Sequence, residues 1–125
     1  MEIPEDLLYT EEHEWVYVEG DTAIVGITDY AQGELGDVVF VELPEVGDHV
    51  QQMEPFGSIE AVKTVSDIFA PVSGEVIEVN SNLEENPQLI NQDPYGEGWI
   101  IKIKMANAKE TEGLLTPEEY HNMIE

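Results

Sequence analysis

The sequence predicts a mainly β protein with one short internal helix and one short C-terminal helix, and three observations support this. Short runs rich in valine and isoleucine alternate with turn residues along most of the 125 residues. Helix signals occur in only two places, after Thr28 and after Thr116. Part of the chain also repeats itself at an offset of 38 to 39 residues, as expected for a duplicated β unit.

The N-terminal quarter of the chain predicts a β-hairpin. Trp15 and Tyr17 belong to its first strand, and residues 23–27 form an apolar second strand. The residues between them, Glu19-Gly20-Asp21, have the small and acidic composition of a short turn.

Helix-capping residues place the two helices. Thr28 is an N-cap residue and Gly36 lies just past Leu35, so a short helix is predicted over residues 29–35. A strand over residues 38–43 should follow it. At the other end, Thr116-Pro117-Glu118-Glu119 has the pattern of an N-cap, a first-turn proline and a capping glutamate. The chain between these helices is expected to be strand and turn, with the acid-rich residues 84–93 forming a solvated loop.

An internal repeat organises the middle of the chain. Two pairs of segments match, at offsets of 38 and 39 residues: Gly36–Val41 with Gly74–Val79, and Glu54–Gly57 with Asp93–Gly96. The two units cover about residues 36–62 and 74–105, with a closing strand over 58–62 in the first and 97–105 in the second. Two copies are too few for a solenoid but suit a closed pair of interlocking sheets with approximate two-fold symmetry.

The repeat aligns Lys63 with Lys102 and thereby selects two lysines. Lys102 lies with Lys104 in an alternating strand, which predicts a solvent-facing side for both. Lys63 instead sits in Val62-Lys63-Thr64-Val65, where the first unit stops and a strand over residues 65–70 begins. We therefore expect Lys63 at the tip of a tight hairpin. Most lone lysines on a protein surface have no special role, but this position, in a chain with so few lysines, sets Lys63 apart.

A lysine at a hairpin tip between two symmetric β halves resembles the attachment site of a biotinyl or lipoyl carrier domain. Biotin carriers of this fold usually have methionine on both sides of the lysine, whereas Lys63 lies between Val62 and Thr64. The resemblance therefore favours a lipoyl carrier.

Six further segments, by their order and spacing around Lys63, resemble the H-protein family of the glycine cleavage system, from about residue 7 to the end. These segments are Tyr9–Val16, Val25–Ala31, Leu35–Val41, Ser66–Ile68, Ala70–Val76 and Asp93–Trp99. The resemblance implies a barrel-sandwich hybrid of the lipoyl/biotinyl type and a single lipoyl-carrier domain over residues 1–125.

The same resemblance implies a cofactor and partners. Lipoate would be attached to Lys63 in amide linkage, and its two sulfurs would give a chain without cysteine its dithiol chemistry. The carrier would accept an aminomethyl group from a pyridoxal-phosphate glycine decarboxylase and deliver it to a folate-dependent aminomethyltransferase. Dihydrolipoamide dehydrogenase would then reoxidise the dithiol. A lipoate ligase or octanoyltransferase would load Lys63.

The carried aminomethyl group is cationic and is lost to water when exposed, so a shielding cleft with a carboxylate would protect it. The resemblance points to Glu14 for this role and, more weakly, to Asp67. The alternative is that both carboxylates cap turns or face water.

The remaining residues indicate no chemistry of the chain's own. His13, His49 and His121 have no spacing typical of a metal site or a catalytic triad, so we expect neither a metal nor catalytic residues and do not predict an enzyme. The 28 acidic residues against 4 basic ones give a net charge of −24. This charge argues against nucleic acid and acidic membranes as partners. With no apolar run long enough to span a membrane, a cytoplasmic monomer is expected.

Two questions stay open at this level. The acidity fits either solubility in a salty cytoplasm or electrostatic steering toward basic partners. Two other functions use the same fold: a donor that passes lipoate to other proteins, or an unmodified acidic β-barrel that acts as a binding module.

Overall fold

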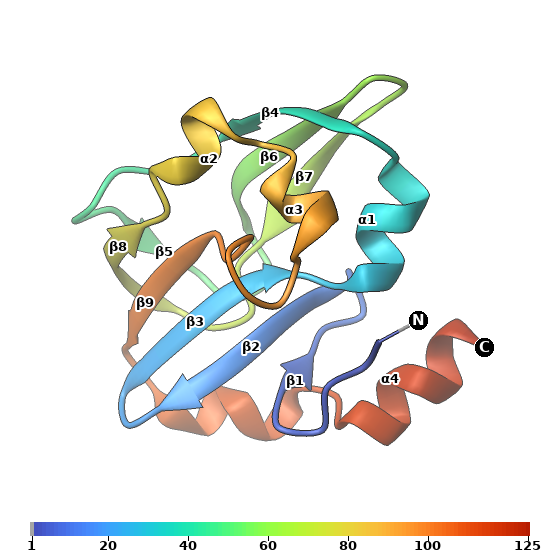
Figure 1. Ribbon diagram of the computed structural model, residues 1–125. Helices are drawn as coiled ribbons and strands as arrows, with labels where there is room; N and C mark the ends of the chain where they lie inside the picture. Colours follow the sequence, from blue (N-terminus) through green and yellow to red (C-terminus); the bar gives the residue numbers. More distant parts are fainter. Residues whose placement is uncertain (1) are drawn as a thin grey trace.

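The computed structural model describes residues 2–125 and contains two antiparallel β-sheets with short helices around them (Figure 1). One sheet has six strands in the order β1-β2-β3-β9-β8-β5, and the other has three in the order β4-β6-β7. The strands are β1 (Leu8–Tyr9), β2 (Glu14–Glu19), β3 (Thr22–Ile27), β4 (Val38–Glu42), β5 (His49–Val50), β6 (Pro55–Ala61), β7 (Val65–Phe69), β8 (Gly74–Val79) and β9 (Ile101–Met105). The helices are α1 (Asp29–Leu35), α2 (Asn82–Glu85), α3 (Leu89–Gln92), α4 (Pro117–Ile124) and the 3₁₀ helix η1 (Ala108–Gly113). The predicted mainly β architecture is confirmed.

The main core lies between the two sheets. Val41, Ile59 and Ile68 from the three-stranded sheet belong to the same buried cluster as Val25 and Ile103 from the six-stranded sheet. A second, smaller cluster lies around Trp15 on β2 and includes Tyr9 and Tyr120, the latter from α4. Because Val16 belongs to the main cluster and Trp15 to the second, this end of β2 is buried on both faces.

Both predicted helices form, with the predicted caps. The Thr28 side chain accepts a hydrogen bond from the backbone N–H of Ala31, and Gly36 ends α1 with φ = 80°. Such a positive φ favours glycine. Thr116 and Glu119 form a reciprocal capping box at the start of α4, which satisfies backbone donors that the helix itself leaves unpaired.

The expectation of a solvated loop over residues 84–93 is correct in its exposure and wrong in its structure. Most of these residues are exposed, but the end of α2 and all of α3 lie within them, and Ile90 is buried in the main core, as is Leu83 of α2 just before them. Helices this short lack the repeated apolar spacing by which a sequence reveals a helix.

The two repeated segments lie in different sheets but pair in the same way. In the first, β4 pairs with β6; in the second, β8 pairs with β9. The second pair of matching segments, Glu54–Gly57 and Asp93–Gly96, corresponds less well in structure. The strand predicted from residue 97 begins only at Ile101, as β9. Residues 94–98 form a turn there, whereas Pro55–Gly57 already belong to β6.

Strands β6 and β7 form a hairpin whose tip extends beyond the body of the molecule on the side of α1 (Figure 1). Within residues 2–125 no helix is both long enough and apolar enough to cross a membrane.

Candidate functional site

Lys63 lies at the exposed tip of the β6–β7 hairpin, as predicted. The backbone N–H of Ala61 donates to the carbonyl of Thr64 at 2.8 Å and closes the turn. The N–H of Val62 donates to the carbonyl of Asp37 at 3.1 Å, which attaches the turn to the segment between α1 and β4. The root of the Lys63 side chain is therefore fixed, while its amine is open to solvent.

The stem of Lys63 lies over the end of α1. A Cβ atom built on Gly36 would be 3.3 Å from Lys63 Cε and 3.8 Å from its Nζ. On both sides of the lysine the neighbouring valines are exposed, Val62 by 76% and Val65 by 64%. An exposed apolar pair beside an exposed amine presents a surface that a modifying enzyme could contact.

The lysines of β9 are placed differently. Ile101, Ile103 and Met105 are buried, so Lys102 and Lys104 point to the opposite side of the strand, as the alternation predicts. The Nζ atom of Lys102 lies 3.1 Å from a Glu78 carboxylate oxygen and 5.1 Å from the centre of the Trp99 ring. Lys63 takes part in neither of the two ion pairs found within residues 2–125.

A cavity of about 310 Å³ opens between α1, the start of β2 and strand β7. Four carboxylate side chains and several apolar ones line it. The lining residues are Glu12, His13, Glu14, Ile27, Tyr30, Ala31, Glu34, Leu35, Ile59, Ser66, Asp67 and Ile68. A cavity with apolar walls and several carboxylates suits a ligand with an apolar chain and a cationic end.

Helix α1 extends from the wall of this cavity to the side chain of Lys63. Its residues 30, 31, 34 and 35 line the cavity, and its last residue precedes the glycine under the Lys63 stem. A helix of seven residues rises about 10 Å. The cavity therefore lies within one short helix length of the root of the lysine side chain.

Glu14 is buried, with only 1% of its surface exposed. One carboxylate oxygen accepts a hydrogen bond from the Thr10 hydroxyl at 2.5 Å, and the other accepts from the backbone N–H of Phe69 at 3.2 Å. The second bond connects β2 of one sheet to β7 of the other. Because each carboxylate oxygen has two lone pairs, both retain capacity for a further donor from the cavity.

Burial raises the pKa of Glu14 from 4.5 to about 7, and the hydrogen bonds from Thr10 and Phe69 oppose this rise. The Glu14 carboxyl group therefore gains or loses its proton near neutral pH. A cation that enters the cavity favours the ionised carboxylate, because the attraction offsets part of the cost of burying a charge.

Asp67 lies on β7 and lines the same cavity, but its side chain is exposed. The structure thus brings the two predicted carboxylates, 53 residues apart in the sequence, to one cavity. Of these two carboxylates, Glu14 is buried and Asp67 is exposed.

Two further carboxylates at this cavity, Glu12 and Glu34, were not identified from the sequence. A signal for Glu34 exists: Tyr30 and Glu34 are four residues apart, as are Ala31 and Leu35, so all four share one side of the predicted helix. No pattern in the sequence distinguishes Glu12 from its acidic neighbours.

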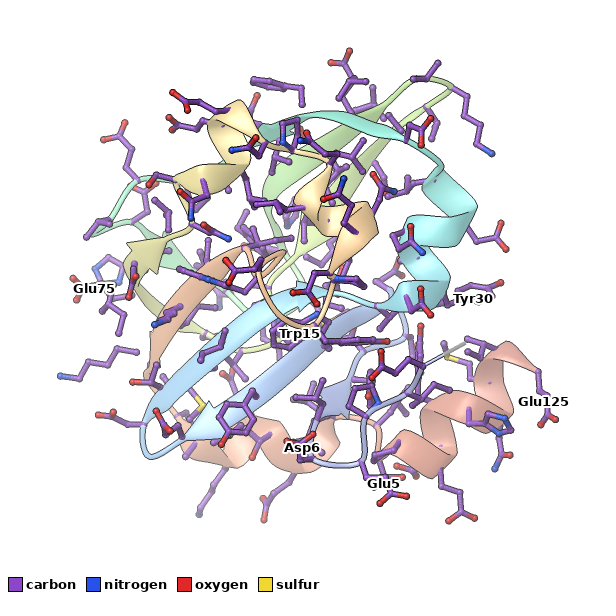
Figure 2. All side chains as sticks on the ribbon, in the orientation of Figure 1. Glu5, Asp6, Trp15, Tyr30, Glu75 and Glu125 are labelled. Carbon is purple, nitrogen blue, oxygen red and sulfur yellow. The ribbon has the colours of Figure 1, made fainter. Side chains whose placement is uncertain are left out.

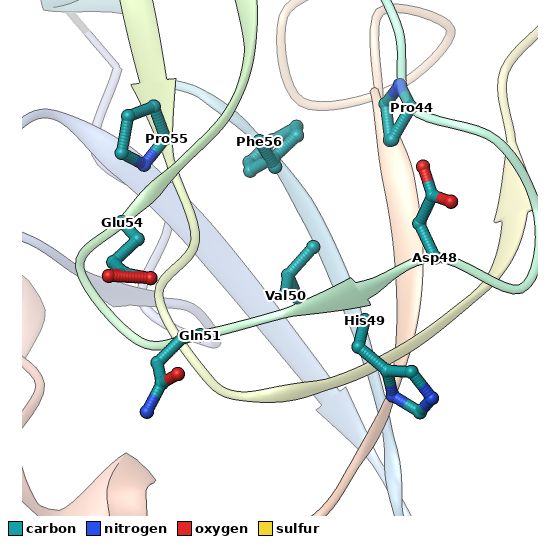
Figure 3. Close-up of a pocket in the computed structure, with 8 residues that line it drawn as sticks. All are labelled: Pro44, Asp48, His49, Val50, Gln51, Glu54, Pro55 and Phe56. Carbon is teal, nitrogen blue, oxygen red and sulfur yellow. The ribbon is translucent and has the colours of Figure 1, made fainter.

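A second hollow, of about 380 Å³, lies beside β5 and contains His49, Asp48 and Glu54 (Figure 3). The carboxylate of Asp48 accepts a hydrogen bond from the backbone N–H of Glu45, so it stabilises the turn before β5. None of the predicted site residues lines this hollow. Among residues 2–125, no cluster of three or more metal-ligating side chains is present.

Comparison with known proteins identifies the family. The family model described as "Glycine cleavage H-protein" matches residues 7–125. The glycine cleavage system H protein of Rubrobacter xylanophilus is 62% identical over 124 residues, which are 99% of this chain and 96% of the relative. That of Halothermothrix orenii is 58% identical over 125 residues, covering 100% of this chain and 98% of the relative.

The fold gives the same result. The crystal structure of a glycine cleavage system H protein from Mycobacterium marinum superimposes with a TM-score of 0.90 at 43% identity and covers 98% of both chains. Matches of this length and identity extend over both sheets, the hairpin and the cavity. The chain belongs to the glycine cleavage H-protein family.

Proposed function

We propose that the chain is the lipoyl carrier of a glycine cleavage system and that lipoate is attached by an amide bond to Nζ of Lys63. The observation that carries this proposal is the position of Lys63: an exposed amine at a hairpin tip, one short helix away from a cavity with four carboxylates. Residues 1–125 would act as one carrier domain.

The residues around Lys63 fit an attached arm. The hairpin is held to Asp37 through the N–H of Val62, so the root of the arm stays in place while the side chain beyond it can rotate. The Lys63 amine is not engaged in an ion pair within the described part of the chain and is accessible to acylation. Lipoate, when bound, supplies a disulfide that can be opened to a dithiol and can carry an aminomethyl group, chemistry that a chain without cysteine lacks.

The cavity residues have a protective role in this proposal. The apolar walls formed by Ile27, Ile59 and Ile68 exclude water, and the carboxylates of Glu14 and Asp67 accept hydrogen bonds from a cationic amine. Glu14 is the stronger candidate, because it is buried and already oriented by Thr10 and Phe69.

The chain itself would catalyse no step. Its partners would be glycine decarboxylase, aminomethyltransferase and dihydrolipoamide dehydrogenase, which act in turn on the arm, and the lipoate ligase or octanoyltransferase that loads Lys63. An exposed tip suits all four, because each active site must receive either the Lys63 side chain or the arm attached to it.

Reconstitution of glycine cleavage tests the proposal. Wild type, Lys63→Arg and the matched control Lys102→Arg are each treated with lipoate ligase and combined with the three enzymes. We expect glycine-dependent NADH formation with wild type and Lys102→Arg and none with Lys63→Arg, because arginine keeps the charge but cannot form the amide. Activity that survives in Lys63→Arg would overturn the assignment of the attachment site.

A further inference from the structure

The C-terminal helix reaches the wall of the cavity through one buried side chain, Tyr120. Its ring is fully buried and stacks on Tyr9, with 4.7 Å between ring centres and an angle of 8° between the planes. Its hydroxyl oxygen lies 2.7 Å from Thr28 Oγ1 and 2.9 Å from His13 Nδ1. A single hydroxyl group of α4 therefore contacts two residues that lie far from it in the sequence.

Both of these residues belong to the structure around the cavity. Thr28 caps the start of α1, the helix that forms one wall. His13 lines the cavity next to Glu14, and its ring lies 4.9 Å from that of Tyr30 on α1. Tyr30 projects on the same side of the molecule as the end of α4 (Figure 2).

The conformation of His13 is constrained. Its φ of 73° lies in the left-handed region, which is unfavourable for a residue with a side chain. Its backbone N–H donates to the carbonyl of Thr10 at 3.2 Å, and its carbonyl accepts from the N–H of Thr28 at 3.0 Å. Such a conformation persists only where surrounding contacts hold it, and the Tyr120 hydroxyl supplies a hydrogen bond to the ring.

Burial determines which group donates and which accepts in the hydrogen bonds between Thr28, Tyr120 and His13. Thr28 Oγ1 already accepts from the N–H of Ala31, and Thr28 is fully buried. Its own proton therefore needs an acceptor, and the Tyr120 oxygen is the one within reach in the described structure. Tyr120 then donates its proton to His13 Nδ1, which must be unprotonated. The reverse order would leave the buried Thr28 proton without a partner.

We propose that Tyr120 is a positioning residue for the cavity: its hydroxyl holds His13 as the neutral Nε2–H tautomer and fixes the imidazole in the cavity wall. The C-terminal helix thereby determines how well the cavity shields the group that Lys63 carries. The shielding part of this inference rests on the proposed carrier function, whereas the tautomer does not.

The burial of His13 favours a neutral ring. Burial lowers the pKa of His13, and the nearby carboxylates of Glu12 and Glu34 oppose this effect. Protonation would place a proton on Nδ1 and so reverse the order of donors through Tyr120 and Thr28.

The tautomer can be measured in the wild-type protein. Nitrogen-15 NMR of the histidine rings at about pH 8, above the lowered pKa of His13, distinguishes a protonated Nε2 from a protonated Nδ1. The His13 signals are assigned by comparison with His49→Gln and His121→Gln. We expect His13 to be protonated at Nε2 alone. A ring protonated at Nδ1, or an equal mixture, would overturn the inference without any variant having to fold.

Tyr120→Phe then tests the positioning role. It keeps the ring that stacks on Tyr9 and removes the hydroxyl. The matched control is Tyr17→Phe, because the Tyr17 ring also packs against the second cluster but its hydroxyl makes no hydrogen bond within residues 2–125. We expect a mixture of His13 tautomers in Tyr120→Phe alone. An unchanged tautomer in this variant would contradict the assigned role.

The second readout is ammonia release from the isolated aminomethyl-loaded carrier, without folate or transferase. Release is expected to be about twofold to tenfold faster in Tyr120→Phe, the range for loss of one neutral hydrogen bond, and unchanged in Tyr17→Phe. Equal rates in wild type and Tyr120→Phe would refute the shielding role. Failure of the carrier proposal would be recognised separately, because Lys63 would then not accept lipoate at all.

Discussion

The side chain of Lys63 lies next to Gly36: a Cβ atom on Gly36 would be 3.3 Å from Lys63 Cε, and Gly36 has a φ of 80°. The glycine thus has two functions at one position. It allows the backbone to leave α1 in a left-handed conformation, and it leaves room for the stem of the lysine. The end of α1 and the side chain of the proposed attachment residue therefore meet at Gly36.

Gly36→Ala and Gly33→Ala should therefore change stability in opposite directions. Alanine at position 36 must adopt a positive φ, so we expect the free energy of unfolding to fall by about 1 kcal/mol. Gly33 lies within α1 with open space around it, and alanine there should raise the free energy of unfolding by about 0.5–1 kcal/mol. Urea unfolding of the two variants provides the measurement. Equal effects would show that the conformation at Gly36 is not the deciding feature.

Glu14 should make stability depend on pH in a recognisable way. Its pKa is about 7 in the folded protein and 4.5 as the ordinary value, so between these values the folded state keeps a proton that the unfolded state has released. The contribution of Glu14 to the free energy of unfolding should therefore fall as pH rises from about 4.5 to 7, by about 3 kcal/mol in total.

Glu14→Gln isolates this contribution from the other carboxylates. Urea unfolding of both proteins at several pH values gives their free energies of unfolding. The value for wild type minus the value for Glu14→Gln should decrease steadily up to about pH 7 and then level off. A difference that is constant across the range would contradict the raised pKa.

Glu14→Gln should also shorten the lifetime of the loaded carrier. A charge-assisted hydrogen bond from a cationic amine is worth about 1.5–3 kcal/mol, so its loss should speed ammonia release about tenfold to a hundredfold. The matched control is Glu112→Gln, an exposed residue outside the cavity. If Glu14→Gln and Glu112→Gln release ammonia at the wild-type rate, Glu14 has only its structural role between β2 and β7, and Asp67 becomes the residue to test.

The acidity of the chain predicts salt-sensitive association. The sequence has 28 acidic residues, and only two ion pairs occur within residues 2–125, so most of this charge is not neutralised internally. If this charge steers the chain onto a basic face of the aminomethyltransferase, their association, followed by stopped-flow fluorescence, should slow as salt is added, because salt screens the attraction over about 10 Å at 0.1 M. A rate that does not change with salt would assign the charge to solubility instead.

The parts of the fold that the sequence predicts are those with local signals. Thr28 and Thr116 mark helix starts because their hydroxyl groups cap backbone N–H groups a few residues away. The hairpin at Lys63 is likewise a local feature, set between two strands of alternating residues. The short helices α2 and α3 escape prediction because each is a single turn whose stability comes from burying Leu83 or Ile90, not from its own sequence.

The candidate site divides in the same way. Lys63 follows from the internal repeat, and Glu14 and Asp67 follow from the family resemblance, but the burial of Glu14 does not follow from either. Its burial arises because β2 is covered on one face by the main core and on the other by the cluster around Trp15 and Tyr120. The contact between Tyr120 and His13 joins residues 107 positions apart, a distance over which no local pattern operates.

The central claim, that Lys63 alone carries lipoate, is tested most directly by mass spectrometry of the chain after treatment with lipoate ligase. Intact mass should show a single lipoyl group on each wild-type chain, and peptide mapping should place it on the peptide that contains Lys63. Lys63→Arg should show no added mass, and Lys102→Arg should behave as wild type. A lipoyl group mapped to Lys102, Lys104 or Lys109, or an unmodified wild-type chain, would contradict the claim.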